Sequence, residues 1–179
     1  HRSIKKAEGP IMPNQPQTFW NFSTHLYDKE GVAEACLSLQ DDFNLDVNLI
    51  LFCYWYGKHF GVVGSPLLQQ IYNFSVEWRD NVVQPLRNLR IWMKKHKEAD
   101  KKWQNLRNKI KANELAAEKY QQEVIENLTM PASKNKKADR AKANIYSNLE
   151  KLLQKSALKL NKDIESRLAV LSENLAEKA

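Results

Sequence analysis

The stretch VNLILFCYWY, at residues 47–56, decides the fold class. It is apolar at nearly every position, and Asp46 just before it is a residue type that commonly caps a helix. So short a run also fits a strand, but helical patterns on both sides favour a helix. A helix that is apolar on every side is normally the buried, central helix of its domain. We therefore predict an all-α protein with Leu49, Phe52 and Trp55 in its core.

The residues before this stretch also read as helices. Thr18 or Asn21 can cap a first helix, and apolar residues recur at spacings of four, three and four from Val32 to Phe43. Only five glycines and six prolines occur in the 179 residues, which favours long helices over an all-β fold. Residues 1–17 are polar and rich in proline, and we expect a flexible segment there, part of it an expression tag.

The residues after this stretch continue the helical pattern. Ser65 followed by Pro66 is a favoured helix start, with serine as the N-cap and proline in the first turn. Pro85 removes a backbone donor, which predicts a kink or break near residues 81–84. We assign residues 18–98 to one compact helical domain.

Residues 99–179 read as long, basic, amphipathic helices. The segment 103–124 has heptad-like apolar steps, and a polar loop containing Pro131 is expected at residues 129–137. From residue 138 to 176 the apolar positions follow an eleven-residue period, which predicts one nearly straight helix. We expect the two helices to form a coiled-coil-like antiparallel hairpin, within one chain or between chains. The predicted contacts on the last helix are Leu160, Ile164, Leu168 and Leu171.

The net charge of +7 is uneven, with +6 of it in residues 99–179. Ten basic residues lie between Arg87 and Lys111 against two acidic ones. On one continuous helix, five of them at spacings of three and four would form a single cationic stripe that faces water. Such a stripe suits a phosphate backbone, with Trp92 or Trp103 as a stacking partner, or is only a solubilising face. The five residues are Arg87, Arg90, Lys94, Lys97 and Lys101.

Acidic residues offer two further hypotheses. Asp41, Asp42 and Asp46 could bind Mg²⁺ and through it a diphosphate, but the sequence lacks the second acidic motif that such a site needs. Alternatively, the first two are solvated at a helix end and Asp46 caps the next helix. Asp46 could also form a buried ion pair with Arg79. No P-loop, dinucleotide fingerprint, nucleophile elbow or zinc spacing occurs in the sequence, so we expect no metal, no cofactor and no enzyme.

The sequence also indicates a compartment. Cys36 and Cys53 lie within apolar helical patterns and suit a reducing environment. The first 17 residues lack the apolar core of a signal peptide. The longest apolar run, at residues 49–56, is too short to span about 30 Å of hydrocarbon. We expect a cytoplasmic protein that does not enter a membrane.

Several blocks resemble one known family. They are FWNFS (19–23), GVAEACL (31–37), LQD (39–41), LDVNLILFC (45–53), WR (78–79) and VVQPLR (82–87). Over residues 18–95 the chain resembles a small proteobacterial family catalogued as domain of unknown function 2390. The resemblance implies a bacterial, cytoplasmic, helical protein, and it supplies no catalytic residue, substrate or cofactor.

These patterns lead to two functional hypotheses. The first is a non-catalytic interaction protein that binds a protein partner, or a second copy of itself, through its C-terminal helices. The alternative is a nucleic-acid-binding protein, for structured RNA or a ribosomal surface, that uses the basic face between Arg87 and Lys111.

Overall fold

A computed structural model describes residues 16–96, 100–133 and 139–175, and within them the chain is almost wholly helical. These residues form eight α-helices and one π-helical turn, η1, without a strand, which confirms the all-α class. Residues 1–15, most of the predicted flexible segment, lie outside the described part. The elements are α1 (Phe19–Tyr27), α2 (Val32–Phe43), α3 (Val47–His59), α4 (Ser65–Trp78), η1 (Arg79–Val83), α5 (Gln84–Lys95), α6 (Lys101–Ser133), α7 (Ala141–Lys155) and α8 (Lys162–Leu175).

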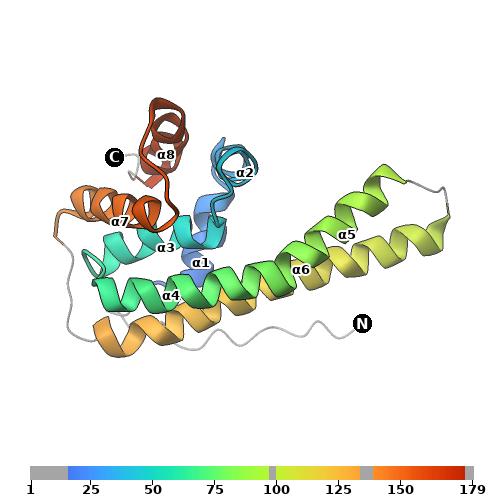
Figure 1. Cartoon of the computed structure of the whole chain (residues 1–179), viewed down its shortest axis with the longest axis horizontal. Helices are drawn as coiled ribbons and strands as arrows, with labels where there is room; N and C mark the ends of the chain where they lie inside the picture. The colour runs from blue at the N-terminus through green and yellow to red at the C-terminus, as the bar shows by residue number, and fades with distance from the viewer. Residues whose placement is uncertain (1–15, 97–99, 134–138, 176–179) are drawn as a thin grey trace, which may run out of the picture.

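Helix α3 is the central helix, as its composition predicts. Leu49, Phe52 and Trp55 are all at most 2% exposed, which confirms their assignment to the core. The Asp46 side chain caps the helix by accepting a hydrogen bond from the Asn48 backbone N–H at 2.8 Å. Around α3 pack α7, α1, α2 and α6, and together these helices form the body of the molecule (Figure 1).

The helix boundaries near the N-terminus follow from capping residues. Thr18, rather than Asn21, caps α1, and its hydroxyl accepts from the Asn21 N–H at 3.3 Å. Asn44 ends α2 with a left-handed φ of 54°. At the start of α4 the expected cap is displaced by one residue: Gly64 is the N-cap, and Ser65 is already helical.

The disruption expected from Pro85 takes the form of a π-helical turn. In η1 the Gln84 N–H donates to the Arg79 carbonyl, five residues back, so one extra residue is accommodated without a break. Pro85 then lies in the first turn of α5, where its fixed φ suits the helix. Helices α4 and α5 therefore form one nearly continuous rod (Figure 1).

The long helix expected after residue 100 is present, but it pairs with a different partner. Helix α6 runs antiparallel to the α4–α5 rod, and α5 with the first half of α6 projects from the body as an arm (Figure 1). Its 33 residues continue through Pro131 to Ser133, so residues 129–133 are helical and not part of a loop. Residues 134–138, the rest of that predicted loop, lie outside the described part.

The prediction of a single straight helix after residue 138 is wrong. The chain forms α7 and α8, separated by a turn in which Ala157 has φ 55°. Asn161 starts the second helix, because its side chain accepts from the Ile164 N–H at 2.9 Å.

The predicted packing of this segment against residues 103–124 is also wrong. Helix α7 packs on α3, and α8 packs on α2 and α1. Ile164, Leu168 and Leu171 are buried in the same core as α3, and Leu160 packs against that core. The core is thus shared by residues on both sides of the boundary predicted at residue 98. None of the described helices has the length and hydropathy needed to cross a membrane.

Candidate binding cleft

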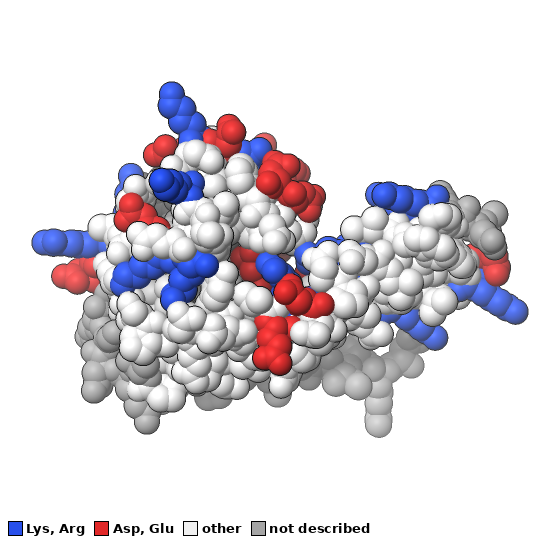
Figure 2. All heavy atoms as spheres, viewed as in Figure 1, with Lys and Arg blue, Asp and Glu red and all other residues white. Residues whose placement is uncertain are grey.

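A cleft of about 1210 Å³ separates the body from the arm. Side chains from α1, α2 and the start of α3 line one wall, and side chains from α5 and α6 line the other. Figure 2 shows this hollow, with acidic side chains on the facing edge of the body and basic side chains on the arm across it. The volume of the cleft exceeds that of a second pocket, about 370 Å³, lined in part by Tyr56, Leu67 and Leu128.

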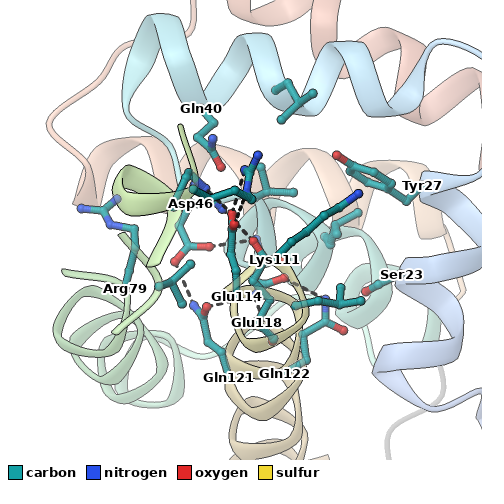
Figure 3. Close-up of a pocket in the computed structure, with 18 of the residues that line it drawn as sticks. Ser23, Tyr27, Gln40, Asp46, Arg79, Lys111, Glu114, Glu118, Gln121 and Gln122 are labelled. Atoms are coloured by element: carbon teal, nitrogen blue, oxygen red, sulfur yellow. Dashed lines mark hydrogen bonds and ion pairs between the residues drawn. The ribbon is translucent and has the colours of Figure 1, made fainter. Parts of the chain in front are cut away.

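A chain of hydrogen-bonded amides forms the floor of the cleft. Gln121 Nε2 donates to Asp46 Oδ2, Asn48 Nδ2 donates to Gln121 Oε1, and Gln122 Nε2 donates to Asn48 Oδ1, each at 2.8 Å. The three amide residues are at most 8% exposed. Because each buried amide is held by its neighbours, this amide chain fixes α3 against α6 in one register. In Figure 3, Gln121 and Gln122 extend from α6 into the region where Asp46 lies.

A cluster of charges ties the two helices of the arm together. Glu114 accepts a hydrogen bond from Arg87 Nε at 3.0 Å. It also accepts one from Arg90 Nε and one from Arg90 Nη2, and the bond from Nη2 is 3.1 Å long. Glu118 accepts from Arg87 Nη2 at 2.6 Å. The Glu114 side chain is only 7% exposed, so these are partly buried, charge-assisted contacts.

The electrostatics of the cleft differ from one carboxyl group to the next. Burial acts against a charge on Glu114, but the hydrogen bonds from Arg90 and Arg87 outweigh it and hold its pKa below the usual value. At Glu118 burial prevails and raises the pKa, although the charge of Arg87 opposes it. Burial likewise raises the pKa of Asp46 in spite of its bond from Gln121. Burial therefore disfavours the charged forms of Glu118 and Asp46, whereas the two arginines favour the charged form of Glu114.

The predicted ion pair between Asp46 and Arg79 is not formed directly. Asp46 is half-buried, and its carboxylate is occupied by the α3 N-terminus and the amide chain. Arg79 donates instead to Asp80 Oδ1 at 3.0 Å and to the Asn44 carbonyl at 3.2 Å. Both side chains line the cleft, and the charge of Arg79 opposes, without contact, the increase in the pKa of Asp46 that burial causes.

The predicted cationic stripe does not exist as one helical face. Helix α5 ends at Lys95 and α6 begins at Lys101, so the continuous helix that the stripe requires is absent. Lys97 lies outside the described residues. Arg87 and Arg90 do not simply face water, because Glu114 and Glu118 hold them in ion pairs. Among the described residues of the predicted stripe, Lys94 and Lys101 are exposed and form no ion pair with another described residue, and they lie on different helices.

The three aspartates of the metal hypothesis have separate roles. Asp42 forms an ion pair with Arg167 at 2.9 Å, and Asp46 caps α3. Asp41 lines the cleft and accepts from Gln40 Nε2 at 3.3 Å. The described residues contain no group of three His, Cys, Asp or Glu side chains that could hold a metal ion.

Exposed apolar side chains line both walls of the cleft. Leu37 on α2 is 47% exposed, and Ile91 on α5 and Leu115 on α6 are 38% and 54% exposed. Exposed aliphatic residues are ordinary when scattered, but here three of them face one hollow. Lys94, Lys95 and Lys111 lie beside them on the arm wall and form no ion pair with another described residue.

The polar residues that α6 contributes to the cleft were not identified from the sequence. They follow spacings of four, three and one, which places them on one helical face. A polar stripe that begins within the heptad-like apolar pattern was the available signal. These residues are Glu114, Glu118, Gln121 and Gln122.

Comparison with known proteins gives a family but no described relative. A family model with the description "Protein of unknown function (DUF2390)" matches residues 18–125, further along the chain than the resemblance seen in the sequence blocks. No curated protein and no solved structure matches the chain. The match includes every residue that lines the cleft and stops before α7. Since it spans more than half of the 179 residues, the chain belongs to the family described as Protein of unknown function (DUF2390).

Proposed function

We propose that this protein is a non-catalytic binding protein whose cleft holds an amphipathic helix of a protein partner. The observation that carries the proposal is the pairing of exposed Leu37, Ile91 and Leu115 on opposed walls above a fixed polar floor. Helix-in-groove recognition uses this arrangement: apolar anchors enter a groove whose walls are themselves helices.

The size of the cleft favours a protein segment over a small molecule. Pockets for small ligands measure about 300–1,000 Å³, and this cleft measures about 1210 Å³. A helix with its side chains is about 10–12 Å across, and a cleft walled by helices suits such a shape.

The charges favour a partner that is acidic on one flank. Lys94, Lys95 and Lys111 on the arm wall are exposed and have no ion pair in the described part of the chain. A second copy of the chain suits this wall poorly, because each copy carries a net charge of +7. Asp41 on the opposite wall requires the partner's other flank to be neutral or basic.

We also propose that the protein is cytoplasmic, since Cys36 and Cys53 are free thiols.

Site-specific photocrosslinking tests this proposal. A photoreactive phenylalanine analogue placed at Leu37, Ile91 or Leu115 should capture a partner in native cells, and the captured peptide should be helical with an acidic flank. The matched control is the same analogue at Tyr146 on α7, which is 50% exposed and lies outside the cleft. Equal capture at Tyr146, or none at the three cleft positions, would contradict the proposal.

A second candidate function uses the end of the arm. The Trp92 ring is 50% exposed and stacks on His96, with ring centroids 4.4 Å apart. We propose as the alternative that RNA binds here, with a base stacked on Trp92 and phosphates on Lys95 and Lys101. This places the interaction at the end of the arm and no longer along a stripe.

Fluorescence anisotropy with single-stranded RNA tests the alternative. Trp92→Ala should weaken binding by about 1–3 kcal/mol, and Lys101→Gln should lower the salt dependence by about one phosphate contact. Tyr146→Ala is the matched control, because Tyr146 is equally exposed on α7. Absence of binding at low salt, where electrostatic attraction is strongest, would exclude the alternative.

A further inference from the structure

Two buried polar atoms in the cleft lining have no hydrogen-bond partner among the residues that the structure describes. They are Oγ of Ser23 on α1 and Oε1 of Gln122 on α6, in side chains that are 3% and 2% exposed. Unpartnered polar atoms are rare in protein interiors, because an unmade bond leaves the desolvation penalty uncompensated. In Figure 3, Ser23 projects from α1 toward the α6 side chains, among which Gln122 lies.

The free atom of Gln122 is fixed as an acceptor by the amide chain. Asp46 Oδ2 accepts from the NH₂ group of Gln121, which leaves the Gln121 oxygen to accept from the NH₂ group of Asn48. Asn48 is left with its oxygen toward Gln122, which donates its own NH₂ group at 2.8 Å. Each amide is therefore oriented by the one before it. In the last amide, Gln122, the NH₂ group is engaged and Oε1 is left as a hydrogen-bond acceptor.

The missing partner must satisfy both atoms and must be small. Gln122 Oε1 needs a donor, whereas the Ser23 hydroxyl can donate one hydrogen bond and accept others. Each atom has less than 1 Å² of accessible surface, so only a compact group reaches them, and only as the side chains around them move apart. A neutral group fits best, because a charged group would lose its hydration at atoms so deeply buried. Burial also raises the pKa of Asp46, Glu118 and Tyr27, which line the same cleft.

We propose that Ser23 and Gln122 form a subsite for one neutral donor–acceptor group, a carboxamide or a hydroxyl, carried by the ligand of the cleft. The group donates to Gln122 Oε1 and exchanges a hydrogen bond with the Ser23 hydroxyl. This inference rests on the proposed function, because an asparagine, glutamine, serine or threonine on the docked helix supplies such a group. It adds a polar anchor to the apolar contacts at Leu37, Ile91 and Leu115.

Small probes test the subsite without knowledge of the partner. The full chain, labelled with ¹⁵N, is titrated with acetamide and 2-propanol and, for comparison, with acetate and methylammonium. Acetamide and 2-propanol should shift the Gln122 side-chain NH₂ signal and the Ser23 backbone amide signal in a saturable manner. Acetate and methylammonium should bind at least about tenfold more weakly, since a buried charge is penalised.

Variants separate binding at the subsite from damage to the fold. Ser23→Ala should weaken acetamide binding about threefold to tenfold, which corresponds to one lost hydrogen bond. Gln122→Met, which also removes the bond to Asn48, should weaken it at least as much. Gln154→Met, at an exposed position on α7, is the matched control and should change nothing. Ser23→Ala should melt no lower than the parent protein, because it removes a hydroxyl that has no partner.

Three outcomes would overturn the subsite. They are no saturable shift with either neutral probe, an equal response to all four probes, or a long-lived internal water between Ser23 and Gln122 that acetamide does not displace. Failure of the subsite and failure of the proposed helix-binding function give different results. If photocrosslinking at Leu37 persists with the same partner affinity in Ser23→Ala, the subsite is refuted and the function stands. If acetamide binds but the cleft positions capture nothing, the helix-binding function fails and the subsite stands.

Discussion

Replacing Glu114 by glutamine measures how firmly α6 holds the arm helix α5. Glu114 is 5% exposed and is bonded to two arginines, Arg87 and Arg90. Removing one partner from a buried charge cluster costs about 3–5 kcal/mol. Arg87 keeps its bond to Glu118 at 2.6 Å, and the Arg90 side chain, 24% exposed, regains some hydration. We therefore expect Glu114→Gln to lower the free energy of unfolding by about 2–3 kcal/mol.

The same carboxylate gives this stability a pH dependence of known sign. The hydrogen bonds from Arg90 and Arg87 outweigh burial and lower the pKa of Glu114 in the folded state. A group with a depressed folded pKa stabilises the protein above its unfolded pKa, about 4.3 for glutamate. The stability difference between the parent protein and Glu114→Gln should be constant near neutral pH. It should shrink as the pH falls below that value toward the folded pKa.

Urea unfolding followed by circular dichroism, repeated across this pH range, provides the measurement. Glu123→Gln is the matched control, because Glu123 is 54% exposed and lies 3.9 Å from Lys119, a contact worth about 0–1 kcal/mol at a surface. A loss below about 1 kcal/mol for Glu114→Gln, or an equal loss in the control, would refute the role of Glu114 in holding α5 against α6.

Three further predictions concern the body that carries the cleft. Phe52→Ala should lower the free energy of unfolding by about 3–5 kcal/mol, because Phe52 is fully buried; a loss under about 1 kcal/mol would place α3 at a surface. Gly57→Ala should destabilise by about 1–3 kcal/mol in thermal unfolding, since a Cβ would lie 2.6 Å from Ile145 Cγ1 and 2.8 Å from its backbone N; unchanged stability would mean that α3 and α7 lie farther apart. Asn148→Leu should speed hydrogen exchange at the Val63 N–H, which now donates to Asn148 Oδ1 at 2.8 Å, and an unchanged exchange rate would show that this bond does not protect the amide.

The N-terminal helices could be predicted because their signals are local. Thr18, Asn44 and Asp46 mark helix ends through their own side chains or backbone, and these preferences do not depend on the rest of the fold. The apolar run in α3 leaves no polar face, so a buried position is the only stable one for it. Here local chemistry and global packing agree.

The division of the C-terminal segment into α7 and α8 could not be predicted, because the spacing of apolar residues indicates which side of a helix is buried and not whether the helix is continuous. The apolar residues of α7 and α8 keep one spacing, although a turn separates the two helices. That turn contains no glycine or proline, and Ala157 adopts a positive φ that only the packing of both helices stabilises. Asn161, the cap of α8, was the one local signal of the break.

The cleft could not be predicted because it depends on a chain reversal. Asp100 caps α6 by accepting from the Lys102 N–H at 3.0 Å, and this cap was the sequence signal of a new helix. Once α5 and α6 are antiparallel, Arg87 meets Glu114 and Glu118, which are 27 and 31 residues away. Spacing along a single helix cannot show such a pairing.

The π-helical turn between α4 and α5 has an evolutionary consequence. Each residue of an α-helix advances the chain by about 100°, so the extra residue in η1 rotates all of α5 about its own axis relative to α4. Deleting one residue within 79–83 would leave every side chain of α5 chemically intact and turn a different face toward α6. Arg87 and Arg90 would lose Glu114, and Ile91 would leave the cleft wall. A one-residue insertion or deletion at this point would therefore change, in a single step, the face that α5 presents to α6 and to the cleft.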